Sequence, residues 1–448
     1  MVFSSLEFVL VFLPVFLLIY YIAPFEKKNL ILFLGSIIFY GYGALENPEY
    51  LLYFLLTILM NFMIGQAMGS YPSRKKGLMI FAVIYNIAPL ALFKITIDNI
   101  ILPVGISFFT FQNLSYVFDV YYEKTKPEKS FVSYGAYISM FPQLIAGPII
   151  TYNTINEQLK EREISLSLAK RGVKYFLFGL GAKVLIANRI GGLWIEIARI
   201  GVESITTQLA WMGIIGYCLQ LYFDFWGYSL MATGMGYMLG FEFPMNFNAP
   251  YRSTNMSQFY RRWHMTLGSW FKEYVYIPLG GNRVSAFRTV VNLFVVWLLT
   301  SLWHGVEWNF LLWGGGIFCL IMLEKFGMGK WMEKHKLVGH LYVLAVSPLM
   351  WLTFVMTDFD SYVIYLSKMF PFFGSLGEAI FPTDYVKYLG IYWPFFLAGF
   401  FFLTETSEKI MEKYHNSIVV KLFLAIVFGL SVYCMYMGMN DPFLYFRF

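Results

Sequence analysis

Apolar stretches long enough to cross a lipid bilayer recur along this chain, and they limit what it can fold into. A helix needs roughly 20 residues to span about 30 Å of hydrocarbon. Inside a bilayer only helices and closed barrels satisfy their own backbone polar groups. The chain therefore predicts an all-α polytopic membrane protein with about eleven or twelve transmembrane helices, and we expect one integral membrane domain over residues 1–448. Windows of about 16 to 20 apolar residues begin near Phe8, Leu30, Tyr50, Gly77, Pro103, Lys174, Leu209, Val284, Trp308, Leu341, Tyr388 and Lys421.

The composition agrees with a membrane protein. Apolar residue types make up 58% of the chain and charged residues 13%, about half the charged share of an average soluble domain. The first window has no basic leader and no small-residue cleavage site, so we expect it to be a first span and not a removed signal peptide.

Charged residues between the windows indicate the orientation. Lysines and arginines follow the first, third and fifth windows, whereas Glu46 and Glu49 follow the second. By the positive-inside rule this pattern places the amino terminus outside. We expect a multi-pass protein of the inner, cytoplasmic membrane. The formal charge of +6 fits basic loops that face anionic membrane lipid, and nucleic acid is not an expected partner.

Residues 133–150 interrupt the apolar pattern. Pro142, Gly147 and Pro148 lie among apolar residues there, which favours a broken or re-entrant helix over a regular span. Irregular backbone at membrane depth must line a cavity or be buried in protein. No repeat of 20 to 50 residues is visible, which argues against a transporter built from repeats.

The spacing of reactive residues excludes several kinds of site. Cys218, Cys319 and Cys434 are scattered singly in apolar runs and are interpreted as packing residues. The chain has no HExxH motif, no cysteine cluster and no intramembrane carboxylate pair, so no metal is expected. A serine hydrolase is not indicated either, since there is no G-x-S-x-G elbow.

Residues 246–283 form the least membrane-like part of the second half. This stretch combines several aromatics with Arg261, Arg262, Lys272 and His264. Amphipathic segments of this kind lie at an interface, with basic groups reaching outward. The basic residues either hold the phosphates of a nucleotide-bearing donor, which arginine forks match in geometry, or anchor the chain to lipid headgroups.

His304 lies between two apolar windows, in the run from Trp303 to Trp308. A titratable imidazole at bilayer depth is costly unless it faces a polar cavity, so its default interpretation is functional. A buried histidine that only bridges backbone groups is the structural alternative. In a functional site, a neutral imidazole would act as a general base that deprotonates a hydroxyl for attack on an acyl donor.

Two further polar residues leave alternatives open. His264 either orients the acceptor, contacts the donor or polarises the acyl carbonyl, or it simply lies on a cytoplasmic amphipathic helix. Asp224 is a lone acid in a strongly apolar region, and it either bonds a histidine or caps a helix break. His335, His340 and His415 lie in or beside charged connections and receive no role.

Taken together, the chain resembles the membrane-bound O-acyltransferase (MBOAT) family, in particular its bacterial branch of alginate and peptidoglycan O-acetyltransferases. The resemblance runs over nearly the whole chain, and its motifs lie at residues 102–112, 142–149, 222–240, 261–267 and 303–305. It implies that His304 matches the essential histidine of the family and His264 its second histidine. It also implies a funnel-shaped helical core that joins a cytoplasmic donor side to an outer acceptor side.

The resemblance also implies the chemistry. In this branch acetyl-CoA is the cytosolic donor, and a cell-envelope polysaccharide is acetylated with the help of an exported acetyltransferase or esterase-like partner. A relative by fold transfers D-alanine to teichoic acid, and this is the nearest alternative. Tyr445 lies between aromatics near the end of the chain, which looks like a tyrosine motif suspected of relaying the acyl group. It is therefore either a transient acyl acceptor or an aromatic anchor at the membrane interface.

Two other classes of protein remain as alternatives. A polysaccharide or lipid transporter would also have many spans and a polar cavity, but it needs no acyl-transfer chemistry. A membrane scaffold leaves His304 unexplained. The resemblance does not decide which polysaccharide receives the group.

Overall fold

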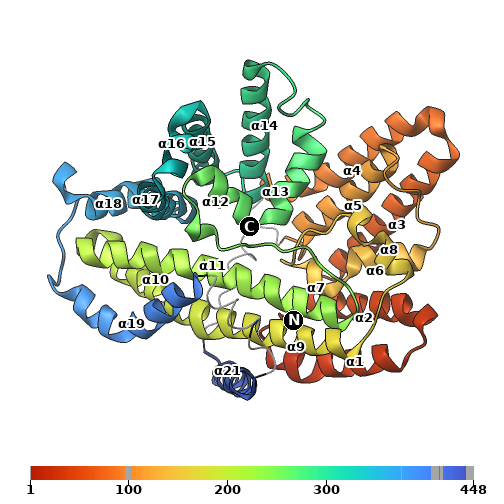
Figure 1. Ribbon diagram of the computed structural model, residues 1–448, viewed down its shortest axis with the longest axis horizontal. Coiled ribbons are helices and arrows are strands. Elements are labelled where there is room, and N and C mark those ends of the chain that lie inside the picture. Colours follow the sequence, from red (N-terminus) through yellow and green to blue (C-terminus); the bar gives the residue numbers. More distant parts are fainter. Residues whose placement is uncertain (1, 96–101, 375, 405–412, 414–416, 440–448) are drawn as a thin grey trace. The chain divides into compact units, whose positions relative to one another are not determined.

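The structure is a computed structural model of the chain that describes residues 2–95, 102–374, 376–404, 413 and 417–439. Helices make up nearly all of the regular structure, and no strand occurs within these ranges. This confirms the all-α prediction. The order of the helices can be followed in Figure 1.

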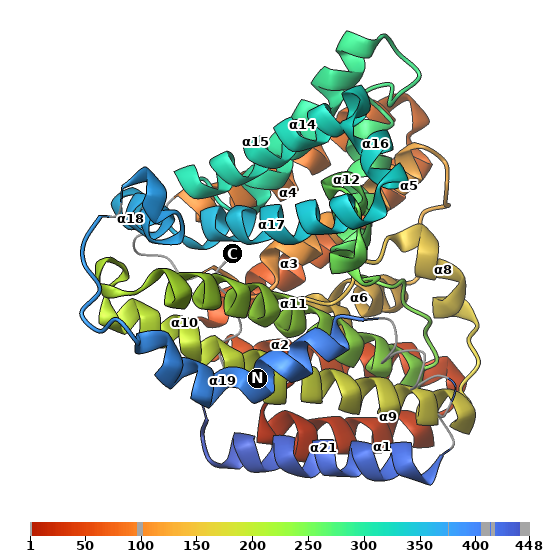
Figure 2. The same ribbon diagram turned by 60° about the vertical axis from the view of Figure 1, so that its left-hand side comes forward.

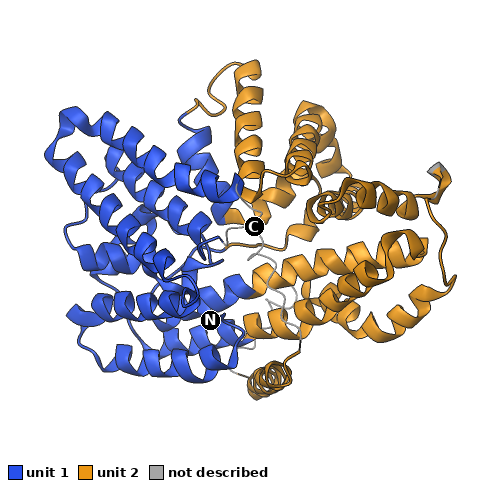
Figure 3. Cartoon of the chain, turned by 180° about the vertical axis from the view of Figure 1, so that it is seen from behind, with its two compact units in different colours: residues 1–177, 228–245, 266–278 blue, residues 178–227, 246–265, 279–448 orange. Residues whose placement is uncertain are grey.

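The described chain forms two compact units that are interleaved in sequence (Figure 3). The first comprises residues 1–177, 228–245 and 266–278, and the second residues 178–227, 246–265 and 279–448. Two long helices, α9 (Leu166–Gly181) and α11 (Thr207–Met238), contribute residues to both units. The expectation of a single domain over 1–448 stays a prediction.

The first unit packs aromatic side chains between its helices. Phe54 and Phe109 meet at 4.9 Å between ring centroids, and Tyr116 and Tyr134 at 4.6 Å. Burial of such large rings supplies most of the packing area of a helix pair. Its helices are α1 (Leu13–Ile22), α2 (Lys28–Gly43), α3 (Pro48–Ser70), α4 (Lys75–Ile95), α5 (Ile106–Tyr121), α6 (Phe131–Ser139), α7 (Phe141–Leu144), α8 (Tyr152–Lys160) and, from its second residue, α13 (Met265–Phe271), with the π-helical turns η1 (Glu7–Phe12) and η7 (Lys272–Tyr276).

The second unit contains the segments of both candidate histidines. Helices α14, α15 and α17 run alongside one another (Figure 2). Tryptophans form the centre of this group. The ring centroid of Trp351 lies 4.8 Å from that of Trp263 and 6.2 Å from that of Trp313. The helices of this unit are α10 (Asn188–Ile200), α12 (Met256–Arg262), α14 (Ala286–His304), α15 (Trp308–Leu323), α16 (Gly329–Lys334), α17 (Lys336–Val355), α18 (Phe359–Met369), α19 (Asp384–Phe402) and α21 (Ile418–Tyr436), with the π-helical turns η4 (Ala182–Ala187) and η8 (Glu324–Met328).

Seven helices of the described chain are long and apolar enough to cross a membrane, and Glu7–Ile22 is a shorter apolar helix. The polytopic class is therefore confirmed. The windows expected near Leu30 and Pro103 correspond to α2 and α5. Each has 16 residues, fewer than the 18 that a membrane-length helix needs here. Those near Leu209 and Tyr388 correspond to α11 and α19, which are not among the seven. The seven are Pro48–Ser70, Pro72–Ile95, Leu166–Ile200, Ala286–His304, Trp308–Lys334, Lys336–Val355 and Ile418–Tyr436.

Candidate active site

His304 is the last residue of the membrane-length helix α14. Its side chain is buried, with 6% of its surface exposed. Four aromatic rings surround the imidazole, and their centroids lie 4.8 to 6.2 Å from its own. A ring packed on several sides has one well-defined orientation. The four rings belong to Trp303, Phe310, Trp313 and Phe354.

Two glycines permit this close packing. A β-carbon on Gly305 would overlap the ring of Phe310, and one on Gly314 would overlap the Ser301 hydroxyl across the α14 and α15 interface. Small residues let helices in membranes approach backbone to backbone. Gly305 therefore brings Phe310 against His304, and Gly314 brings the two helices together.

His264 follows the short helix α12 and is 3% exposed. Its Nδ1 lies 3.0 Å from Oδ1 of Asn246. A carboxamide oxygen only accepts hydrogen bonds, so Nδ1 carries the proton and Nε2 carries the lone pair. Burial lowers the pKa of His264 to about 3, because apolar surroundings disfavour the charged imidazolium. The side chain is therefore neutral at physiological pH.

The backbone at His264 is strained. Its φ is +45°, in the left-handed region, which costs an L-residue roughly 1 to 2 kcal/mol. The segment is held in place by Asn246, whose carbonyl oxygen accepts a hydrogen bond from the Met265 amide at 2.9 Å. Asn246 thus holds the strained turn with two hydrogen bonds, one to its backbone carbonyl and one to its side-chain oxygen. Strain of this kind is concentrated at functional sites.

The two histidines contact the same indole. The Trp303 ring centroid lies 4.8 Å from that of His304 and 6.1 Å from that of His264. Phe225 of α11 packs edge-on against His264 at 4.6 Å. All of these residues belong to the second unit. One aromatic cluster therefore joins two buried imidazoles from segments far apart in sequence.

Asp224 pairs with a lysine. Its Oδ1 lies 2.8 Å from Nζ of Lys183, and both side chains are buried, at 0% and 1% exposure. Lys183 also donates to Oδ1 of Asn188 at 2.8 Å and lies in the π-helical turn η4. Asp224 lies inside the continuous helix α11, so it does not cap a helix break. The pair joins Lys183 of the membrane-length helix Leu166–Ile200 to Asp224 of α11, and such a buried pair is costly unless both charges are satisfied.

The basic candidates lie at the surface. Arg261 is exposed and its Nε donates to the Ser257 carbonyl at 3.1 Å. Arg262 is half-buried and donates to the Asn248 carbonyl at 3.4 Å. Lys272 is also exposed and belongs to the first unit. Exposed cations suit phosphate binding and lipid anchoring equally well, so their role stays a prediction. No group of metal-ligating side chains occurs in the described ranges.

Sequence comparisons identify the family. The family model of the membrane-bound O-acyltransferases matches residues 127–367, more than half of the chain. The chain belongs to the membrane-bound O-acyltransferase family. It is accordingly an O-acyltransferase and a multi-pass membrane protein.

Three similar proteins are named for different polymers. The chain is 33% identical over 405 residues to the probable alginate O-acetylase AlgI of Pseudomonas aeruginosa, an alignment that covers 85% of the chain and 75% of the relative. It is 34% identical over 367 residues to the peptidoglycan O-acetyltransferase of Helicobacter pylori, with 70% and 68% covered. A teichoic acid D-alanyltransferase of Bacillus subtilis is 28% identical over 280 residues, with 57% and 69% covered.

The first unit of this O-acyltransferase contains the predicted break. Helix α6 ends at Ser139, α7 spans only Phe141–Leu144, and the chain is then irregular as far as α8. Side chains satisfy parts of its backbone, since Thr266 Oγ1 accepts from the Ile149 amide at 2.9 Å and Tyr137 donates to the Ile150 carbonyl at 2.8 Å. The broken helix is confirmed, and the cavity that it was expected to line stays a prediction.

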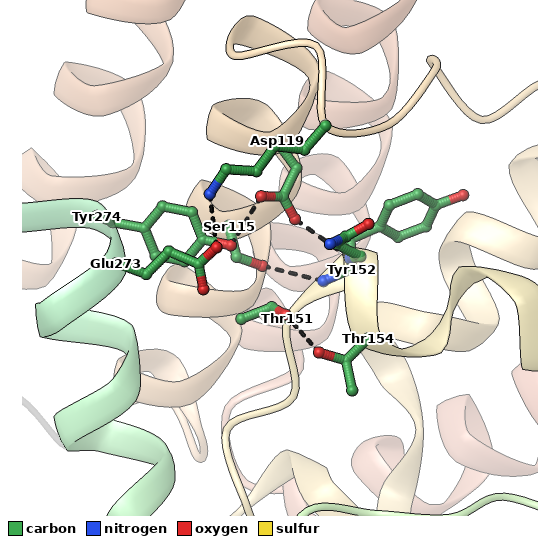
Figure 4. Close-up of polar contacts among 9 residues, drawn as sticks. Ser115, Asp119, Thr151, Tyr152, Thr154, Glu273 and Tyr274 are labelled. Carbon is green, nitrogen blue, oxygen red and sulfur yellow. Dashed lines mark hydrogen bonds and ion pairs between the residues drawn. The ribbon is translucent and has the colours of Figure 1, made fainter. Parts of the chain in front are cut away.

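A polar cluster holds the end of this segment (Figure 4). The carboxylate of Asp119 accepts from the Tyr274 hydroxyl at 2.9 Å and from the Asn153 amide at 3.2 Å. Next to Asp119, Nζ of Lys124 lies 2.5 Å from Oε1 of Glu273. Asp119 thus connects α5, the start of α8 and the turn η7. This cluster stabilises the segment that follows His264 in the chain.

Sequence reasoning found the two histidines but missed their supports. Asn246 was not singled out, because an asparagine in a polar segment carries no spacing signal. Lys183 did carry a signal in the sequence, because it is a lone cation in an apolar window and a lone acid such as Asp224 needs a partner. Tyr445 lies outside the described residues, so its role stays a prediction.

Proposed function

We propose that this O-acyltransferase transfers an acetyl group from acetyl-CoA towards hydroxyls of an extracytoplasmic cell-envelope polysaccharide. The observation that carries the proposal is the pair of buried imidazoles, His264 and His304, which contact one indole. The similarity to proteins named as alginate and peptidoglycan O-acetylating enzymes supports acetyl as the transferred group.

His304 acts as the general base in this proposal. Its neutral imidazole takes the proton of the acceptor hydroxyl, and the hydroxyl oxygen attacks the thioester carbonyl. The new C–O bond forms, the C–S bond breaks, and the proton passes from His304 to the departing thiolate. Aromatic rings on four sides keep water from the reacting atoms, which strengthens the electrostatic interactions there.

The tautomer of His264 narrows its role. Because Nδ1–H is donated to Asn246, Nε2 offers a lone pair and no proton. Polarising an acyl carbonyl requires a donor, whereas orienting a hydroxyl requires an acceptor. His264 therefore orients the acceptor by accepting a hydrogen bond from a donor group other than the attacking hydroxyl, whose one proton goes to His304.

The remaining assignments belong to the same proposal. Arg261 and Arg262 of the second unit hold phosphates of the donor, which planar guanidinium groups match in geometry. The same role for Lys272 of the first unit stays a prediction. The Tyr445 hydroxyl, activated by His304, is the transient acceptor: its oxygen takes the acetyl group from the thioester, and the resulting ester is cleaved by the next hydroxyl in the relay, which takes the acetyl group and returns a proton to the Tyr445 oxygen. An exported acetyltransferase or esterase-like partner then completes transfer to the glycan.

The test uses the purified full-length protein in detergent with radiolabelled acetyl-CoA and the partner present. His304→Ala should abolish acetyl transfer, and His335→Ala, a change at an exposed histidine, should leave it unchanged. Normal transfer by a well-folded His304→Ala protein would exclude the base assignment. Transfer from a D-alanyl carrier thioester, with none from acetyl-CoA, would favour D-alanylation instead.

A further inference from the structure

Glu324 is a buried carboxylate that the proposed reaction does not use. It directly follows α15 as the first residue of the turn η8, and its side chain is 4% exposed. Burial of a carboxylate is unfavourable unless hydrogen-bond donors surround it. The membrane-length segment Trp308–Lys334 contains this residue, where the cost of a buried charge is high. The groups that supply the donors therefore show what the carboxylate holds in place.

Most of these donors come from the first turn of α12. Oε1 of Glu324 accepts from the Met256 amide at 2.6 Å, and Oε2 accepts from the Ser257 amide at 2.8 Å and the Ser257 hydroxyl at 2.5 Å. The Tyr342 hydroxyl of α17 also donates to Oε1, at 3.1 Å. Met256 and Ser257 are the first two residues of α12, and amides at a helix start have no partner inside the helix. The carboxylate thus fixes the start of α12 through one hydrogen bond from each amide.

The other end of α12 leads to the second histidine of the proposed reaction. α12 ends at Arg262, and His264 follows after one intervening residue. The helix has seven residues and is a rigid element of roughly 10 Å. A shift of its first turn is therefore carried over to the turn that holds His264.

Helix α15 connects Glu324 to the surroundings of the other histidine. Phe310 and Trp313 lie in its first two turns, and their ring centroids are 6.2 and 5.1 Å from that of His304. α12 packs against α15. All of these residues belong to the second unit. One helix thus contacts His304 near its start and, through Glu324, holds the segment of His264 at its end.

We propose that Glu324 is a positioning residue for His264. By fixing the first turn of α12 to the end of α15, its carboxylate sets where the imidazole of His264 lies relative to that of His304. Glu324 acts through α12 and not by contact with a substrate. A carboxylate suits this task because both of its oxygens accept, whereas the carboxamide of glutamine has one acceptor and one donor group. The proposal rests on the proposed function, in which His264 orients the acceptor.

The first test measures the position of His264 without any enzyme activity. Diethyl pyrocarbonate modifies accessible neutral imidazoles, and mass spectrometry of the full-length protein in detergent gives the rate at each histidine. His264 is 3% exposed, so it should react slowly in the unaltered protein. Glu324→Gln places an amide nitrogen against a donor of α12. We expect it to raise the rate at His264 about tenfold, the effect of one lost charge-assisted hydrogen bond on local opening.

Glu333→Gln is the matched control. It removes the same charge beside the same turn, but Glu333 is exposed and accepts from the side chains of Asn255 and Gln258 and not from backbone amides. The rate at His264 should then change by less than about twofold. Glu324→Asp keeps two accepting oxygens, and it should restore part of the protection.

Four results of this test would overturn the proposal. They are an unchanged rate at His264 in Glu324→Gln, the same rise in Glu333→Gln, no difference between Glu324→Asp and Glu324→Gln, and an equal rise at His304. The last result would mean that Glu324 stabilises the whole unit and does not position one histidine.

Acetyl transfer connects the proposal to the proposed function. Glu324→Gln should lower kcat about tenfold, because a small misplacement of a catalytic group lowers the rate. Added to His264→Asn, it should lower kcat by less than about twofold further, since residues that act as a unit are not additive. Equal losses with and without His264 would contradict positioning through this histidine. Failure of the unaltered protein to transfer acetyl would count against the proposed function, whereas the modification rates still decide whether Glu324 positions His264.

Discussion

Different contacts hold the imidazoles of His304 and of His264 in place. His304 ends a long helix, and four aromatic rings fix its orientation. His264 lies on a strained turn, and a hydrogen bond from Nδ1 to Asn246 fixes its protonation. The amide of Asn246 also chooses the nitrogen of His264 that carries the proton.

Replacing each histidine by asparagine tests this difference most directly. We expect His304→Asn to lower kcat by a factor of about 10² to 10⁴, the usual contribution of a general base. His264→Asn should lower it by only about 10- to 100-fold, since it removes an orienting group. Asparagine also tolerates the positive φ at position 264. Acetyl transfer at saturating acetyl-CoA measures both effects, and equal losses would contradict the assigned roles.

We expect the next largest effect on activity from removing the side-chain amide of Asn246. Asn246→Ala leaves Nδ1 of His264 without its acceptor, and we expect kcat/KM for the acceptor to fall about tenfold, with KM for acetyl-CoA unchanged. Asn248→Ala is the matched control, because Asn248 is exposed and its contacts to Arg262 use only backbone atoms. A loss of similar size in the control would show that the effect comes from the loop and not from the tautomer.

A methyl group between α14 and α15 tests the packing around His304. Gly314→Ala places a β-carbon against the Ser301 hydroxyl, and overpacking of this kind costs about 1 to 3 kcal/mol. Gly315→Ala meets nothing within 4 Å and should be neutral. Thermal unfolding in detergent should show a lower Tm for Gly314→Ala alone, and equal Tm values would mean that the helices are not in close contact.

The smallest expected effect is on the dependence of stability on pH. The pKa of His264 is about 3 in the folded protein, below about 6.5 for an unfolded histidine. The unfolded chain therefore binds a proton that the folded chain does not, and stability falls as pH drops below 6.5. At pH 5.5 the loss is about 1.4 kcal/mol. The decline of Tm between pH 7.5 and 5.5 should be smaller in His264→Asn, and an unchanged decline would show that His264 titrates normally.

Part of this arrangement was predictable from the sequence. Residues 133–150 were expected to be broken because Pro142, Gly147 and Pro148 lie close together and each disfavours a regular helix. His304 stood out because an imidazole between apolar windows is unusual. Lys183 and Asp224 each stand out as lone charges in apolar stretches, but the sequence does not say which two helices pack together, so their pairing needed the structure.

The sequence by itself determined that the chain folds in a lipid bilayer, that it is helical, and which residues are candidates for catalysis. These properties follow from the length of apolar stretches and the cost of buried charge, and both act locally along the chain. Only the tertiary structure decided which candidates meet and in which protonation state. The contact of His264 and His304 with one tryptophan and the hydrogen bonds of Asn246 to the strained turn depend on packing between distant segments. Such contacts join residues that local patterns treat independently, so they appear only when the helices have assembled.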